Sequence, residues 1–335
     1  KVNLIGVTGT HGKTSTTALL AHIFMFNGVN ISYIYGGVTS FNGIGGHYGD
    51  ENLPLLLETD EAFNTFKELE IDSLLVTNID YDHVDHFGSY KKLLKAFETV
   101  INNVKNKCIL NTDDKELLNL IRPGDISYSS TENSTYEVKY PNYFSHEGKE
   151  YTIKTKLIGN HFISNITGAI ALAKINGISI EQSLNSIEHF VGVKRRTEFI
   201  GKFNGVNFYD DYGHHPTEIK ATTKALKENT VGNLIVIFQP HRFTRTRDHF
   251  DDLKNSFNYS DLTLITDIYS AGEKPIPGIS SLLFEGDGIK YIKSPRLVPH
   301  YVKTNIKSGD TVLTIGAGDI TLLGPQILKY LNENK

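Results

Sequence analysis

The chain of 335 residues contains a single cysteine, Cys108, so it cannot form an intrachain disulfide. Free thiols are typical of the reducing cytoplasm, and we expect a cytoplasmic protein. Cys108 lies in an apolar run, which favours a buried structural thiol over a nucleophile. Residues 1–6 lead straight into a strand-like segment and have neither the apolar region nor the cleavage site of a signal peptide.

The sequence also lacks long apolar runs and a strong charge of one sign. No stretch approaches the ~20 consecutive apolar residues that a membrane-spanning helix needs. The net charge is −4, from 34 basic and 38 acidic residues, and gives no reason to expect a nucleic acid or an anionic membrane as a partner. An anionic substrate must therefore be bound locally, by a few placed groups.

Short apolar runs and helical patterns alternate along most of the chain, and this predicts an α/β fold. The strands expected are 2–7, 55–57, 74–76, 206–209, 234–238, 262–266 and 311–315. The helices expected are 14–26, 90–104, 161–176, 181–189, one from Pro216, one through 248–257, and 320–331. Polar turns between alternating segments in 125–158 suggest an antiparallel edge.

A polar segment at 192–196 is the expected linker between two domains. Residues 1–195 are predicted to form a central P-loop domain, in which helices flank a mostly parallel sheet. Residues 196–335 are predicted to form a smaller, Rossmann-like α/β domain.

A glycine-rich segment, Gly6–Thr14, stands between the first predicted strand and the first predicted helix. In such a loop the backbone N–H groups and the helix N-terminus bind phosphate, Lys13 bridges the terminal phosphates, and the Thr14 hydroxyl ligates Mg²⁺. Val7 stands where the common P-loop has its first glycine. The alternative is a glycine-rich turn with an incidental lysine, but strand, loop and helix together favour ATP binding.

Polar groups follow two strands of the first predicted domain, where parallel sheets bind ligands. Glu58 ends one strand and is a candidate Mg²⁺ ligand, whereas Asp60 and Glu61 fit helix capping equally well. His83 follows the next strand and could bind a metal. A histidine next to Asp82, however, more often forms a surface pair with the acid than it ligates a metal.

Two further clusters follow strands of the second predicted domain. Asp210–Glu218 holds two histidines and two consecutive acids before a proline-initiated helix, more than a helix cap requires. In Gln239–Arg247, Arg242 and Arg245 are three apart, so on a helical turn they would share a face and could bind a carboxylate. The alternative for these arginines is a solvated basic turn.

Together these clusters resemble the Mur ligase family of peptidoglycan synthesis, and within it the branch that adds L-alanine. The segments that carry the resemblance are Thr8–Thr14, Glu58–Glu61, Thr77–Asp85, Gly159–Asn165, Asp210–Glu218, Phe238–Thr246 and Asp267–Glu273. The sequence departs from the family pattern at two places and from other branches of the family at a third. Ala62-Phe63 replaces a Ser-Asp pair, Phe162 replaces an asparagine, and Phe97 stands where other branches carry a carbamoylated lysine, so we expect no such lysine here.

The resemblance implies the site residues. The expected ATP contacts are Gly9, Thr10, His11, Gly12, Lys13, Thr14, Ser15 and Asn165. The expected ligands of Mg²⁺, or of Mn²⁺, are Thr14, Glu58 and His83. The expected catalytic residues are Lys13, His83 and His214, with His214 reaching the metal–phosphate region from the second domain. The expected substrate contacts are Tyr212, His241, Arg242 and Arg245, of which the two arginines hold the amino-acid carboxylate.

The activity implied is ATP-dependent ligation of L-alanine to the carboxylate of UDP-N-acetylmuramate through an acyl phosphate. Related ligases, such as one that recycles murein tripeptide or a folylpolyglutamate synthase, are the nearest alternatives. Family members begin with a UDP-binding domain of roughly one hundred residues. This sequence starts at Lys1, with the strand that leads into the ATP loop, so we expect the chain to lack that domain. An inactive ATP-binding fragment is therefore a further alternative.

Overall fold

The structure is a computed structural model that describes residues 3–39, 43–61, 65–80 and 87–334. The chain divides into two compact units, Lys1–Val193 and Lys194–Lys335, and each is described by itself. Within the described ranges, every helix is too short or too polar to cross a membrane.

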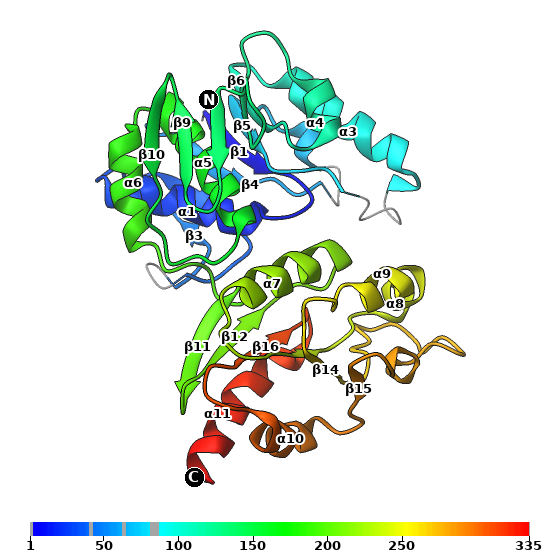
Figure 1. The fold of residues 1–335 in the computed structure, drawn as a ribbon. Coiled ribbons are helices and arrows are strands. Elements are labelled where there is room, and N and C mark those ends of the chain that lie inside the picture. Colours follow the sequence, from blue (N-terminus) through cyan, green and yellow to red (C-terminus); the bar gives the residue numbers. More distant parts are fainter. Residues whose placement is uncertain (1–2, 40–42, 62–64, 81–86, 335) are drawn as a thin grey trace. The chain divides into compact units, whose positions relative to one another are not determined.

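The first unit is built on one large sheet (Figure 1). Its described strands are β1 (Leu4–Thr8), β2 (Ser32–Ile34), β3 (Gly46–His47), β4 (Leu55–Glu58), β5 (Ser73–Val76), β6 (Lys107–Asn111), β7 (Ile126–Ser129), β8 (Tyr136–Lys139), β9 (Tyr143–His146) and β10 (Lys149–Thr152). Their order is β10-β9-β8-β7-β6-β5-β1-β4-β2-β3. From β8 to β2 neighbouring strands are parallel, whereas β3, β9 and β10 join antiparallel.

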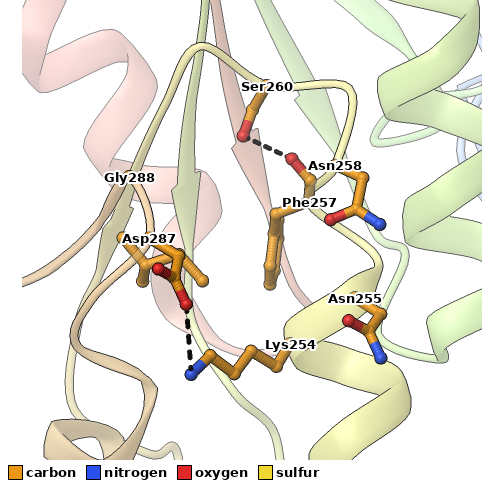
Figure 2. Close-up of a pocket in the computed structure, with 8 residues that line it drawn as sticks. Lys254, Asn255, Phe257, Asn258, Ser260, Asp287 and Gly288 are labelled. Atoms are coloured by element: carbon orange, nitrogen blue, oxygen red, sulfur yellow. Dashed lines mark hydrogen bonds and ion pairs between the residues drawn. The ribbon is translucent and has the colours of Figure 1, made fainter.

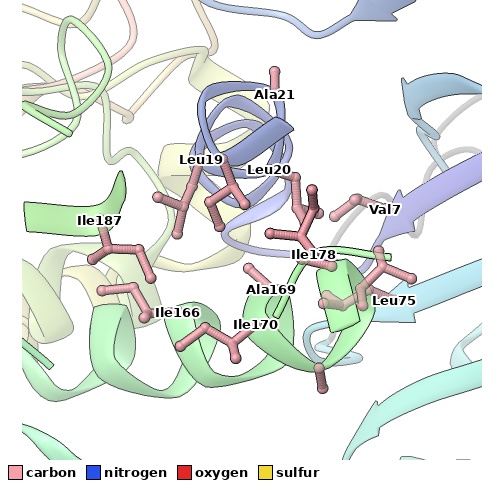
Figure 3. Close-up of a cluster of buried hydrophobic side chains, with 14 of the residues drawn as sticks. Val7, Leu19, Leu20, Ala21, Leu75, Ile166, Ala169, Ile170, Ile178 and Ile187 are labelled. Carbon is pink, nitrogen blue, oxygen red and sulfur yellow. The ribbon is translucent and has the colours of Figure 1, made fainter. Parts of the chain in front are cut away.

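Helices cover both faces of this sheet. They are α1 (Lys13–Phe26), α3 (Tyr90–Asn103), α4 (Lys115–Leu120), α5 (Asn160–Ile175) and α6 (Ile180–His189), with a 3₁₀ turn η1 (Thr65–Glu68). Helices α1, α5 and α6 share one core with the sheet (Figure 3), and α3 and α4 share another. Strand β5 shows why both cores form: Leu75 faces the first, and its neighbours Leu74 and Val76 face the second. A strand buried on both faces reads as a continuous apolar run.

The second unit has a smaller sheet of six described strands (Figure 1). They are β11 (Glu198–Phe203), β12 (Val206–Asp211), β13 (Leu234–Phe238), β14 (Leu262–Ile265), β15 (Ile289–Tyr291) and β16 (Thr311–Ile315), in the order β11-β12-β16-β13-β14-β15. Only β11 is antiparallel to its neighbour. The last strand, β16, lies between β12 and β13, in the interior of the sheet.

Helices again flank this sheet. They are α7 (Pro216–Glu228), α8 (Phe243–Asp248), α9 (Phe250–Asn255), α10 (Val298–Asn305) and α11 (Leu323–Glu333), with 3₁₀ turns η2 (Ser281–Phe284), η3 (Pro295–Leu297) and η4 (Asp319–Leu322). Helices α10 and α11 share a core with β12, β13, β14 and β16. Helix α7 contacts β13, and Phe257 after α9 lies with its ring 5.1 Å from that of Phe238.

The predicted α/β fold class is confirmed, and so is an antiparallel edge within 125–158. The helix expected through 248–257 is present but shorter, as α9, and a separate short helix, α8, precedes it. His249 has φ −117° and ψ 23°, outside the helical region, and separates α8 from α9. Strand β11 directly follows the linker and was not expected, because its residues alternate only weakly between apolar and polar.

Candidate functional site

The glycine-rich loop runs from the end of β1 into the first turn of α1, as predicted. Two glycines permit its path, since Gly9 has φ +131° and Gly12, which caps α1, has φ +84°. A Cβ on Gly9 would lie 2.1 Å from Thr77 Oγ1, and a Cβ on Gly12 would lie 2.6 Å from Asn165 Nδ2. Both positions therefore exclude a side chain on steric grounds as well as by conformation.

The end of β5 fixes the loop from the side. The backbone N–H of Thr10 donates to the Asn78 carbonyl (3.0 Å), and the N–H of His11 donates to Asn78 Oδ1 (2.8 Å). The His11 carbonyl accepts hydrogen bonds from Asn78 Nδ2 (3.0 Å) and Thr77 Oγ1 (2.6 Å). The His11 ring nitrogen Nε2 lies 3.0 Å from Asp80 Oδ2. This network holds the backbone of the loop independently of any ligand, which is the preorganisation that a phosphate site needs.

Lys13 opens α1 and turns its ammonium group back over the loop. Its Nζ lies 2.7 Å from the Gly9 carbonyl oxygen, 3.2 Å from that of Thr10, and 2.8 and 3.1 Å from the two carboxylate oxygens of Glu61. Glu61 has no exposed surface. Burial raises the pKa of Glu61 to about 7, although the charge of Lys13 acts in the opposite direction.

Among the described residues, the pairing with Lys13 brings Glu61 into contact with the phosphate loop, a role that the sequence did not indicate. Sequence reasoning did not include it among the site residues. The only signal was its place three residues after Glu58, in a segment rich in acids.

Thr14 and Glu58 lie together, as the predicted metal site requires. The Thr14 hydroxyl donates to Glu58 Oε1 (2.7 Å), and the N–H of Gly36 donates to Glu58 Oε2 (2.6 Å). A hydroxyl and a carboxylate are the hard oxygen ligands that Mg²⁺ and Mn²⁺ prefer. The donor set therefore fits a divalent cation next to the phosphate loop. The third predicted ligand, His83, lies outside the described residues.

The remaining predicted ATP contacts also surround the loop. Ser15 is buried in the first turn of α1, and Asn165 lies in the first turns of α5 against Gly12. Thr10 is buried, and its hydroxyl accepts a hydrogen bond from the N–H of Asp80 (2.9 Å). Thus the structure brings together the predicted residues from Gly9 to Ser15, Glu58 and Asn165.

In the second unit, the predicted substrate residues follow the ends of parallel strands β12 and β13. Asp211 ends β12 and is buried, with Oδ2 accepting from the N–H of Thr197 (2.6 Å) and Oδ1 from that of Gly213 (2.7 Å). Burial raises the pKa of Asp211 to about 6 against the opposing effect of Arg196. Asp210 accepts from the hydroxyls of Thr314 and Thr321 (both 2.6 Å). Both carboxylates therefore hydrogen-bond to groups of the protein and stabilise the turn after β12.

Aromatic rings cluster after the two strands. The ring of His214 lies 5.4 Å from that of Tyr212 and 5.9 Å from that of His241, and His241 stacks on Tyr269 at 5.6 Å. His214 Nδ1 donates to the Tyr212 carbonyl (3.2 Å). Burial, followed by the neighbouring His214 and Arg245, lowers the pKa of His241 to about 4. His241 is therefore neutral at neutral pH.

The two arginines do not share a helical face as expected. Arg242 precedes α8 with φ +71°, while Arg245 lies inside the helix. Arg242 Nε donates to Glu273 Oε1 (2.6 Å), whereas Arg245 Nη1 contacts His241 Nδ1 (3.3 Å). Glu273 also accepts from the N–H (3.0 Å) and the hydroxyl (2.6 Å) of Thr244. Despite partial burial, these donors lower the pKa of Glu273 to about 2.

A separate cleft in the second unit is lined by residues of α9 and by those around Ser260 and Gly288 (Figure 2). Lys254 Nζ lies 3.9 Å from Asp287 Oδ2 there. Ser260 and Gly288 precede β14 and β15, so the cleft lies at the amino ends of these strands. None of the predicted site residues lines it.

Comparisons with known proteins agree with this geometry. Residues 7–173 match the Mur ligase middle domain, and residues 195–318 match the glutamate ligase domain of Mur ligases. A UDP-N-acetylmuramate–L-alanine ligase of Mesorhizobium japonicum is 36% identical over 95% of this chain and 74% of its own length. A ligase of the same name from a Chelativorans species is 34% identical over the same shares.

The chain belongs to the Mur ligase family. Among solved structures, the UDP-N-acetylmuramate–alanine ligase of Thermotoga maritima superposes on this Mur ligase with a TM-score of 0.82 and 26% identity, over 100% of this chain and 76% of the other. A murein peptide ligase of Psychrobacter arcticus has the same fold, with a TM-score of 0.66 and 21% identity. The family expected from the sequence motifs is therefore confirmed.

Proposed function

We propose that this Mur ligase joins L-alanine to the carboxylate of UDP-N-acetylmuramate with consumption of ATP. The proposal is carried by the relatives named UDP-N-acetylmuramate–L-alanine ligase. They align over 95% of the chain, so the alignments include both groups of site residues. ATP is assigned to the first unit, with its phosphates over Gly9 to Thr14. The carboxylate of L-alanine is assigned to Arg242 and Arg245 in the second unit.

The chemistry proposed is a transfer in two steps. A carboxylate oxygen of UDP-N-acetylmuramate attacks the γ-phosphorus of ATP, and the bond to ADP breaks. The amine of L-alanine then attacks the acyl phosphate carbon, loses a proton, and phosphate leaves. Both steps need charge neutralisation and positioning more than a covalent nucleophile. Lys13 and the loop N–H groups supply part of this charge. A divalent cation held by Thr14 and Glu58, with His83, would supply the rest.

Neutral His241 has a defined role in this assignment. Because Arg245 Nη1 contacts His241 Nδ1, the ring proton is on Nε2, and the ring orients the arginine. Tyr212 and His214 lie beside His241 and would line the same side of the amino-acid site. His214 is proposed as the catalytic residue of this unit.

The proposal is tested by measuring ADP release and ligated product with UDP-N-acetylmuramate and each of several amines. The chain spans about three quarters of the length of its relatives. The assay is therefore run on the chain alone and on the chain fused to the remaining segment of one relative. ADP release that depends on L-alanine supports the proposal. Release that depends instead on murein tripeptide would favour the tripeptide-recycling activity, and absence of ligation by both proteins would reject the assignment.

A further inference from the structure

Glu61 is a buried acid that the proposed mechanism does not use. It has no exposed surface, and its two carboxylate oxygens lie 2.8 and 3.1 Å from Lys13 Nζ. An ammonium group has three protons to donate. Here Lys13 has four acceptor atoms within hydrogen-bond distance, two on Glu61 and one each on Gly9 and Thr10. Its donors are therefore fully used by the protein itself.

A phosphate oxygen can bind Lys13 only by replacing one of these acceptors. The Gly9 and Thr10 carbonyls belong to the loop backbone, which Asn78 and Thr77 hold in place. The acceptor that a phosphate oxygen can replace is therefore the side chain of Glu61. Ionised Glu61 is negatively charged, as phosphate is. Phosphate and ionised Glu61 thus compete for one cation.

A carboxylate that loses its cation in a buried site is costly to keep charged. Among described residues, the charged groups that act on Glu61 are Lys13, which favours ionisation, and Asp60, which opposes it. The carboxylate of Glu58 accepts hydrogen bonds from Thr14 and Gly36. With Lys13 bound to phosphate, the backbone N–H of Glu61 would still favour its ionised form, but the negative charges of Asp60 and of the phosphate would both disfavour it.

We propose that Lys13 exchanges Glu61 for the phosphates of the nucleotide, and that Glu61 takes up one proton from solvent as the nucleotide binds. The inference rests on the ATP site of the proposed function and adds a proton to its binding equilibrium. The proton adds to a carboxylate oxygen of Glu61, and no bond to phosphorus forms or breaks. The pKa of Glu61, raised to about 7 while Lys13 is still its partner, is consistent with this direction.

The pH dependence follows from the sign of the exchange. Below pH ~7 Glu61 is already protonated and Lys13 is available, so nucleotide binds without proton uptake. Above pH ~7 each binding event must add a proton, and affinity falls up to about tenfold per pH unit. At pH 8.5 the wild-type chain should bind about thirtyfold more weakly than it would with Glu61 already neutral.

The test is calorimetric titration with a non-hydrolysable magnesium–ATP analogue, in pairs of buffers with different ionisation enthalpies. We expect the wild type to take up close to one proton at pH 8.5 and close to none at pH 6. Glu61→Gln, which keeps the shape and removes the charge, should abolish this uptake and bind at least tenfold more tightly than wild type at pH 8.5. The ionisation of the nucleotide itself is common to both proteins and cancels in the comparison.

Asp60→Asn is the matched control. Asp60 also lies near Lys13, with 3.9 Å between Nζ and Oδ1, but its side chain is 49% exposed and can stay charged in water. We expect this variant to take up the same proton as the wild type. Nucleotide binding without proton uptake by the wild type, or equal uptake by Glu61→Gln, would overturn the inference and leave ATP binding intact. Failure of the wild type to bind the nucleotide would reject the proposed function as well.

Discussion

Replacement of Gly9 by alanine tests whether the loop geometry is a steric requirement. Gly9 has φ +131°, and alanine in such a conformation costs about 1–3 kcal/mol. The new Cβ would also lie 2.1 Å from Thr77 Oγ1 and 3.0 Å from the backbone N and O of Asn78. The loop or the end of β5 must then move by about 1 Å, since ordinary contacts begin near 3.5 Å.

That movement would break the hydrogen bond from Thr77 Oγ1 to the His11 carbonyl, a further loss of about 1 kcal/mol. The combined destabilisation is about 2–4 kcal/mol. For a unit of this size it lowers Tm by roughly 10 °C. Because the displaced N–H groups are those that would contact phosphate, we also expect nucleotide affinity to fall at least tenfold.

Gly28→Ala is the control that separates conformation from contact. Gly28 follows α1 with φ +78°, and a Cβ there would meet no atom within 4 Å. We expect a loss of about 1 kcal/mol and unchanged nucleotide affinity. Thermal unfolding and nucleotide titration of both variants provide the measurement. If Gly9→Ala had the same Tm as Gly28→Ala and the same nucleotide affinity as the wild type, the steric reasoning would be refuted.

Three other outcomes are expected. Lys13→Ala should weaken ATP binding by well over tenfold in a direct titration, and retained binding and turnover would contradict the phosphate-loop assignment. Glu273→Gln removes the charge that orients Arg242, so KM for L-alanine should rise at least tenfold while the Kd for ATP stays unchanged; an effect on ATP instead would assign Glu273 elsewhere. The pKa of Asp211, about 6 when folded, exceeds the unfolded value near 3.9, so the folded state binds the extra proton between these values. Its contribution to stability should decline by about 2 kcal/mol as pH rises from 4 to 7, and Asp211→Asn should show a flatter dependence of Tm on pH than the wild type.

The fold was largely predictable because its strands are short apolar runs buried on both faces. Strands β13 and β16 have the bounds expected from the sequence, and β4 and β5 each extend one residue further. Helices were predictable where one long pattern was uninterrupted, as in α1. The break at His249 could not be foreseen, because nothing in the pattern of 243–257 marks the residue that leaves the helix.

For the candidate site, the sequence indicated where polar residues lie along the strands better than it indicated their contacts. Strand ends indicated where polar groups would gather, since parallel strands direct their carboxyl ends to one edge. The sequence could not show that Glu61 turns back to Lys13, a contact across 48 positions. Nor could it show that Arg242 adopts a positive φ, which few arginines do. That conformation is held by the hydrogen bond from its N–H to the Tyr269 carbonyl (2.8 Å).

The interior position of β16 has a consequence for synthesis of the chain. Strands β12 and β13 both hydrogen-bond to β16, yet residues 239–310 are made between β13 and β16. At about 5–20 residues per second, a ribosome needs roughly 4–14 s to add these 72 residues. Throughout that interval β12 and the apolar strand β13 each have an unpaired edge open to other nascent chains. Slow translation of this stretch should therefore increase the demand for chaperones.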